Sequence, residues 1–298
     1  MSEKQNPTKK KQKAPFNIYK LFTIILLIIL IVIAGILLRN WYVQNQAEKQ
    51  YEDLAAQVNR LQESMRDNAI SVPSQNEDET QIAEMEQGTE STEDSELSQL
   101  GISIPEKTLD WDALHAVNPD IYAWIYIPGT DIDYPILQNA VDDSYYLNYN
   151  MNGSKGYPGC IYTEKINSKD FTDFDTVVYG HNMRDDSMFA TLHYFEDSAF
   201  FANCPYIYVY TGDKVLVYEI WSAYESDNLH ILYSNDFTTQ SGRQIYLDKI
   251  YNKADSANMR NDIQATDQSH ILTLSTCIKG KSQNRFLVQA VLLNEEEL

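Results

Sequence analysis

The sequence predicts a mainly β fold, a closed barrel or sandwich of about eight short strands, behind a membrane-spanning segment. From Pro105 onward, short apolar runs alternate with polar residues and are separated by Gly, Pro and Asp turns. All but three of the 21 Tyr residues lie in this region, and aromatic residues favour strands. Near the N-terminus, an uncharged apolar stretch is long enough to cross a bilayer.

Helices are expected at two places in the Tyr-rich region. Trp111–Val117 forms a short helix that stops at Asn118-Pro119. Thr239–Asn252 carries apolar residues without strand alternation and forms a helix before the next strand. The remaining apolar runs predict strands at Ile121–Ile127, Ile132–Leu137, Gly159–Tyr162, Thr176–Tyr179, Tyr206–Tyr210, Val215–Tyr224, Ile271–Ser275 and Phe286–Leu293.

The N-terminal region predicts a membrane anchor. Residues 1–20 contain six lysines, and residues 21–38 are uncharged and apolar. Eighteen helical residues span about 27 Å, close to the thickness of a bilayer core. A cleaved signal peptide is the alternative, but this apolar core is longer than an ordinary signal core and no clear cleavage site follows. The lysine excess predicts a cytoplasmic N-terminus, with the rest of the chain outside.

Residues 39–105 are expected to form a stalk, and residues 106–298 a folded domain. Within the stalk, residues 43–70 predict a helix with a narrow apolar stripe of Leu54, Val58, Leu61 and Met65. That stripe fits either a short coiled coil or docking helix, or a monomeric stalk helix. Residues 73–100 are rich in Ser, Glu, Gln and Asp, and predict a disordered spacer.

Charge and cysteine spacing exclude several classes of function. The net charge of −20 argues against a nucleic-acid partner, which requires a basic surface. The chain has no C-x-x-C pair and no D-x-D-x-D-G calcium loop, so neither a metal nor another cofactor is expected. Cys160 and Cys204 either pair in a disulfide or lie buried as free thiols.

A third cysteine, Cys277, is the first candidate for chemistry. It ends the apolar run Ile271–Ser275 in the sequence Thr-Leu-Ser-Thr-Cys, and a polar turn follows from Lys279 to Asn284. Arg285 then opens the next run. In a hairpin of this kind the thiol and the guanidinium lie close together, and a nearby cation favours the thiolate.

A cysteine nucleophile needs a group to exchange its proton, and histidine is the usual one. Of the five histidines, His181 stands apart because it follows the strand Thr176–Tyr179 and a glycine. A strand end followed by glycine is a common position for a side chain that projects into a site. Asp133 and Asp175 are candidates for orienting His181, and the spacing selects neither.

These motifs together resemble those of the class B sortases, membrane-anchored cysteine transpeptidases of Gram-positive bacteria. The resemblance covers residues 106–298. It is carried by Thr273–Cys277 with Arg285, by Tyr179–Met183 continuing to Asp186–Phe189, by Trp124–Thr130 with Ile132–Ile136, and by the helix before the Cys strand.

The resemblance implies a sortase-type closed β-barrel with Cys277 as nucleophile, His181 as general acid and base, and Arg285 as the oxyanion stabiliser. It places a groove wall near Leu147. Ser275 shares a strand face with Cys277, so Ser275, Thr276 and Leu147 are the candidate substrate-binding residues, with structural packing as the alternative reading.

The implied partners are secreted proteins with a C-terminal sorting motif of the N/S-P-x-T type, and a peptidoglycan precursor or crossbridge amine. A pilus-assembling sortase would instead use a pilin lysine. The rivals are a cysteine endopeptidase, in which water resolves the thioester, and a non-enzymatic surface scaffold with a free thiol.

Overall fold

The structure, a computed structural model, describes residues 18–70, 97, 101–254 and 257–298. The chain divides into two compact units, Met1–Tyr42 and Val43–Leu298, and each is described by itself. Helix α1, Ile18–Ile70, contributes to both. The basic tail lies largely outside the described residues, as does the expected spacer apart from Leu97.

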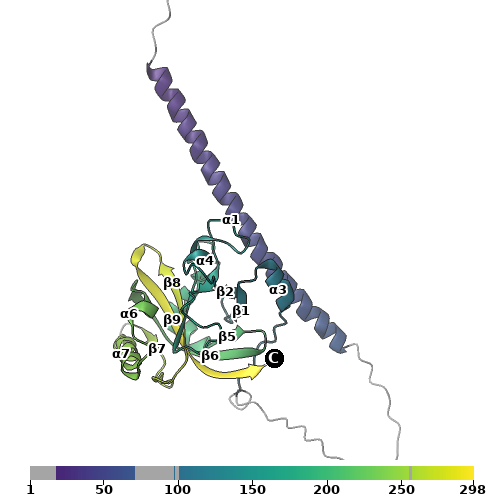
Figure 1. The fold of residues 1–298 in the computed structure, drawn as a ribbon, viewed down its shortest axis with the longest axis vertical. Helices are drawn as coiled ribbons and strands as arrows, with labels where there is room; N and C mark the ends of the chain where they lie inside the picture. The colour runs from purple at the N-terminus through teal and green to yellow at the C-terminus, as the bar shows by residue number, and fades with distance from the viewer. Residues whose placement is uncertain (1–17, 71–96, 98–100, 255–256) are drawn as a thin grey trace, which may run out of the picture. The chain divides into compact units, whose positions relative to one another are not determined.

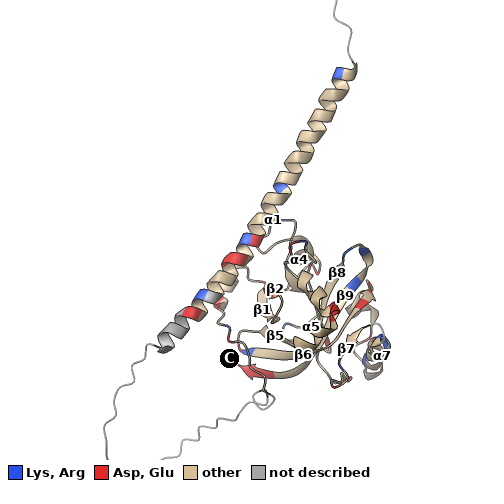
Figure 2. Cartoon of the chain, turned by 180° about the vertical axis from the view of Figure 1, so that it is seen from behind, with Lys and Arg blue, Asp and Glu red and all other residues tan. Residues whose placement is uncertain are grey.

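In the first unit, α1 is apolar on every side. Among the described residues, the stretch Tyr19–Glu63 is the one helix that is long and apolar enough to cross a membrane, judged by length and composition. The Ile, Leu, Val and Phe side chains between Lys20 and Arg39 are exposed on all faces of the helix. Figure 2 shows this length of α1 in tan between two blue bands. A helix of this kind is stable only where its surroundings are apolar.

The second unit is built on a closed β-barrel (Figure 1). The strands pair in the order β5-β1-β2-β3-β4-β8-β9-β6, and β6 pairs with β5 to close the ring. Pairing is parallel between β2 and β3 and between β4 and β8, and antiparallel elsewhere. The strands are β1 Ile121–Tyr126, β2 Asp133–Leu137, β3 Ile161–Thr163, β4 Asp175–Tyr179, β5 Tyr206–Tyr210, β6 Lys214–Asp227, β8 Ile271–Ile278 and β9 Lys281–Glu297.

Alternate residues of the strands enter two different cores. In β1, Ala123 and Ile125 pack inside the barrel, whereas Trp124 faces a second core on the outer surface. Both faces of the strand are therefore buried, which explains why the apolar runs are nearly continuous.

The second core is covered by the part of α1 that belongs to this unit and by α3, Trp111–Val117. Leu54 and Val58, half of the apolar stripe noted in the sequence, are buried here together with Leu97. The Tyr51 hydroxyl donates to the Gly159 carbonyl at 3.0 Å. Leu54 and Val58 thus pack on this chain's own domain, as residues of a docking helix do.

Helix α7, Gln240–Tyr251, covers another part of the barrel and precedes β8. Its side chains Leu247 and Ile250 pack against Trp221. The Thr239 hydroxyl accepts from the Gly242 amide and caps the helix. The two helices expected at 111–117 and 239–252 are therefore confirmed.

All eight expected strands are also confirmed, with differences at their ends. β6 and β9 are longer than expected, and the polar turn expected over residues 279–284 is wrong: only Lys279 and Gly280 separate β8 from β9. Among the polar residues after Gly280, Lys281 pairs with Ile278 and Asn284 with Asp227. Elements that the patterns did not predict are α4 Tyr145–Asn148, η1 Ala190–Glu196, α5 Ser198–Asn203, α6 Ile231–Ser234 and the two-residue β7 Asn258–Met259.

The cysteines are all free thiols, so Cys160 and Cys204 do not pair. Cys160 is buried in the second core, and burial raises its pKa to about 12. Cys204 is half-buried, and burial likewise raises its pKa. Cys277 alone is exposed.

Candidate active site

Cys277 and Arg285 face each other across the β8–β9 hairpin. They are register partners in the antiparallel pair, which brings their Cβ atoms to within about 5 Å. The turn closes at Gly280, whose φ of +80° is a conformation that favours glycine. The register of the β8–β9 pair shifts between Cys277 and Ile278, at the end of the hairpin. The expectation that the thiol and guanidinium are neighbours is confirmed.

The guanidinium of Arg285 is held by the hairpin itself. Its Nη1 donates to the Ser282 carbonyl at 3.1 Å and to the Asn284 carbonyl at 2.9 Å. Both bonds come from the same guanidinium nitrogen, Nη1, and they hold the positive charge of Arg285 beside the end of β8. A fixed guanidinium in this position is suited to an anionic oxygen.

His181 follows β4, which runs parallel to β8. Gly180 lies against Ile161 and Phe189, where an added Cβ would come within 2.6 Å of either side chain, so only glycine fits. Its amide donates to the Ser275 carbonyl at 3.2 Å, and its carbonyl accepts from the Thr276 hydroxyl at 2.8 Å.

These bonds fix the histidine loop against the strand that carries Cys277. Because they join Gly180, directly before His181, to Ser275 and Thr276, the two residues before Cys277, they fix the two candidate catalytic residues relative to each other. Thr276 therefore has a structural contact in addition to its place at the cavity.

The ring of His181 is oriented by a main-chain carbonyl. Its Nε2 donates to the Leu147 carbonyl at 2.9 Å, and the ring of Tyr157 packs edge-on at 5.0 Å. Burial lowers the pKa of His181, and the bond to Leu147 opposes this in part. The neutral ring therefore carries its proton on Nε2, and its lone pair is on Nδ1.

Asp133 and Asp175 do not orient this ring. Asp133 accepts from the Trp124 indole and pairs with Lys107. Asp175 accepts from Thr273 at 2.7 Å inside the barrel wall. The carbonyl of Leu147 has the orienting position, and no spacing in the sequence indicates a main-chain group.

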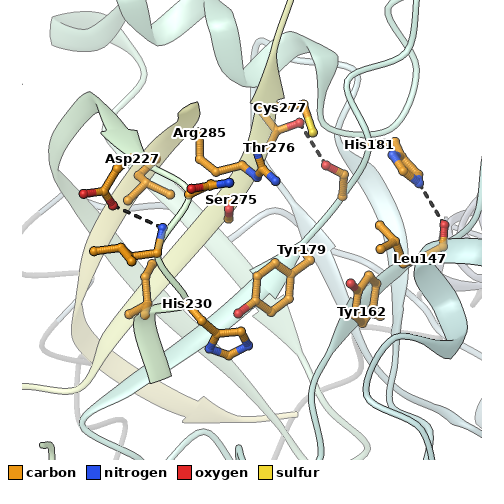
Figure 3. Close-up of a pocket in the computed structure, with 15 residues that line it drawn as sticks. Leu147, Tyr162, Tyr179, His181, Asp227, His230, Ser275, Thr276, Cys277 and Arg285 are labelled. Carbon is orange, nitrogen blue, oxygen red and sulfur yellow. Dashed lines mark hydrogen bonds between the residues drawn. The ribbon is translucent and has the colours of Figure 1, made fainter. Parts of the chain in front are cut away.

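One cavity of about 250 Å³ brings the candidate residues together (Figure 3). Figure 3 shows Cys277 and His181 at one end, and Tyr162, Tyr179 and His230 at the other. The candidate substrate-binding residues also line it, with Leu147 exposed and Ser275 and Thr276 buried. The full lining is Leu147, Tyr162, Tyr179, Gly180, His181, Asp227–Ile231, Ser275, Thr276, Cys277, Arg285 and Leu287.

The far end of the cavity was missed by the sequence reasoning. His230 pairs with Glu164 at 2.9 Å, and the Tyr179 hydroxyl and His230 Nδ1 are buried without a partner among the described residues. Tyr179 belongs to the motif Tyr179–Met183, whereas nothing in the spacing indicates His230. In the described part of the chain no cluster of three acidic, His or Cys side chains is suited to a metal ion.

Comparisons with known proteins agree on one family. The model of the Sortase domain matches residues 125–293. Sortase B of Listeria monocytogenes is 33% identical over 184 residues, which is 61% of this chain and 73% of the relative.

Solved structures give the same result. The structure of Clostridium perfringens sortase B has a TM-score of 0.54 and 32% identity, over 62% of this chain and all of the other. A Staphylococcus aureus sortase B–substrate complex has a TM-score of 0.55 and 25% identity, over 61% of this chain and 84% of the other. The expected barrel is thereby confirmed.

Proposed function

The chain belongs to the sortase family, with class B sortases as its relatives, and on this premise we propose that it is a membrane-anchored cysteine transpeptidase. It cleaves a C-terminal sorting motif of secreted proteins and transfers the acyl group through a thioester to a cell-wall amine. The observation that carries the proposal is that His181, which follows β4, and the hairpin pair Cys277 and Arg285 line one cavity.

In the proposed mechanism, Cys277 is the nucleophile and His181 moves the proton. With Nε2–H bonded to Leu147, the neutral ring accepts the thiol proton at Nδ1. The thiolate adds to the peptide carbonyl, and the oxyanion lies beside Arg285. When the tetrahedral intermediate collapses, the C–N bond breaks, the leaving amine takes the proton from His181, and a thioester to Cys277 remains.

The second half of the reaction reverses these roles. An incoming amine adds to the thioester and gives a proton to His181, and the C–S bond breaks as the new amide forms. Water in place of the amine would yield hydrolysis. We assign substrate contact to Leu147, to Ser275 and to the methyl group of Thr276, whose hydroxyl donates to Gly180.

The proposal includes the anchor and its orientation. The apolar length of α1 spans the membrane, residues 1–20 face the cytoplasm, and residues 39–105 connect to the catalytic domain at 106–298. The lysine excess before residue 21 supports this orientation. The S. aureus relative is known with a substrate bound, which supports the choice of a sorting-motif peptide as substrate here.

Product analysis with a quenched sorting peptide of the N/S-P-x-T type tests the proposal. The full-length enzyme in detergent micelles is incubated with the peptide alone, with oligoglycine or a diaminopimelate-type amine, and with a lysine peptide that represents a pilin. We expect amine-dependent product, and the preferred amine distinguishes wall anchoring from pilus assembly.

Two variants serve as controls for the thiol. Cys277→Ala should abolish cleavage, whereas Cys204→Ala removes another free thiol outside the cavity and should retain it. Cleavage that ignores every amine would support a plain endopeptidase instead. If no peptide of a motif library is cleaved, and cells that carry Cys277→Ala show no loss of function, the non-enzymatic scaffold would be supported.

A further inference from the structure

A second histidine lies behind Cys277, outside the cavity. His193, in η1, places its Nε2 3.0 Å from the Cys277 carbonyl oxygen. Asn182, directly after His181, donates its Nδ2–H to the same oxygen at 2.8 Å. Neither side chain is among the described residues that line the cavity. The carbonyl of the candidate nucleophile therefore has two side-chain nitrogens within hydrogen-bond distance.

The ring of His193 is fixed on its other sides. Its Nδ1 lies 2.6 Å from Glu196 Oε1, and the ring of Phe286 stacks on it at 4.9 Å. Phe286 directly follows Arg285 and is the register partner of Thr276. The side chain of His193 is only 21% exposed, so its orientation is set by packing as well as by hydrogen bonds.

The chemistry of the partners defines what His193 donates. A carboxylate only accepts hydrogen bonds, so His193 Nδ1 donates to Glu196. Asn182 Nδ2 lies 3.0 Å from His193 Nε2 and 2.8 Å from the Cys277 carbonyl oxygen, so the amide links the ring to the backbone of Cys277.

We propose that His193, held by Glu196 and acting beside Asn182, is a positioning residue that clamps the backbone of Cys277. This inference rests on the proposed function. The clamp holds β8 near its end, where few other contacts fix the backbone. The thiol is exposed there, the pairing with β9 becomes irregular at the next residue, and the Lys279-Gly280 turn follows. Without it, the end of the strand has more freedom, and misplacement of a reacting group by about 1 Å can cost about 100-fold in rate.

Steady-state kinetics of His193→Ala in the full-length enzyme test the clamp. Because His193 does not contact the cavity, we expect kcat to fall about 10-fold to 100-fold while KM changes less than about twofold. His193→Gln, whose amide N–H can reach the same oxygen, should recover part of the loss. The matched control is His115→Ala, which removes an imidazole bonded to the Ile121 carbonyl at 3.1 Å, away from the site.

Alkylation of Cys277 by iodoacetamide separates the clamp from the proposed function. The rate is followed without peptide or amine, by mass spectrometry of the fragment that contains Cys277. We expect His193→Ala to slow alkylation several-fold and His115→Ala to leave it unchanged. This result supports the clamp even if no sorting peptide is cleaved.

Two outcomes would overturn the clamp. One is a wild-type alkylation rate in His193→Ala. The other is an equal loss of kcat and of alkylation rate in His193→Ala and His115→Ala, in proportion to the fall in their melting temperatures. That result would show that His193 only stabilises the fold. His193→Gln provides the comparison if His193→Ala does not fold.

Discussion

At the scale of single residues, Arg285 both bonds to its own hairpin and presents positive charge to the cavity, which a lysine at the same position could not do together. Its guanidinium donates from one nitrogen to two carbonyls of its own hairpin, and the rest of the planar fork faces the cavity. Its position opposite Cys277 was predictable because a hairpin is local in sequence. The bonds that hold it were not, since they depend on the shape of the turn.

We expect Arg285→Lys to lower kcat/KM about 100-fold or more, because a point charge cannot both bind the hairpin carbonyls and reach the oxyanion. Kinetics of amine-dependent peptide cleavage measure the effect. Lys281→Arg, an exchange of cations on the same hairpin but outside the cavity, is the control. A wild-type rate in Arg285→Lys would remove this residue from the mechanism.

At the scale of elements, the part of α1 that follows the apolar segment belongs to the same unit as the barrel. The part from Val43 onward packs Leu54 and Val58 into the second core, and Tyr51 bonds the Gly159 carbonyl. Gly159 in turn lies against His181, since a Cβ there would be 3.4 Å from the imidazole Cδ2. This part of α1 therefore supports the loop beside the candidate general base.

Leu54→Ala should destabilise the domain by about 2–5 kcal/mol, the usual cost of removing a buried leucine side chain. Urea unfolding of the full-length protein in micelles, followed by Trp fluorescence, measures the free energy of unfolding. Asp53→Ala changes an exposed neighbour on the same helix and should have little effect. Equal stability of the two variants would show that the helix does not contribute to the core.

At the scale of the whole molecule, a deeply buried carboxyl group, that of Asp175, should make the stability of the protein depend on pH. Asp175 is fully buried, accepts from Thr273 and Tyr246, and burial raises its pKa from 3.8 to about 7. The folded protein therefore binds a proton that the unfolded chain releases near pH 4. The stabilisation is complete below that pH and is lost as the pH rises through about 7.

Melting temperatures between pH 5 and pH 8 test this prediction. We expect the wild-type value to fall across this interval relative to Asp175→Asn, whose amide does not titrate. The side chain lies away from the cavity, so kcat at pH 6 should change little in the variant. Parallel melting curves for the two proteins would contradict the assignment of this carboxyl.

Much of the fold was predictable because strand periodicity, turn residues and helix signals are local. The eight strands, the helices at 111–117 and 239–252, and the uncharged segment all came from such patterns. The short helices were not predictable: η1 and α6 lack periodicity and form where tertiary packing allows. The length of β9 was missed because its first residues are polar and exposed, and so lack the apolar alternation that indicates a strand.

Local patterns in the chain predict the strands, the apolar segment and the neighbouring positions of Cys277 and Arg285, since a short turn joins the strands that carry them. The surroundings of the thiol depend instead on tertiary contacts. The parallel pairing of β4 with β8 brings His181 to Cys277, α4 supplies the Leu147 carbonyl, and η1 brings His193 behind the nucleophile. These contacts join segments far apart in the chain, and the physical reason they escape local patterns is that barrel closure selects them.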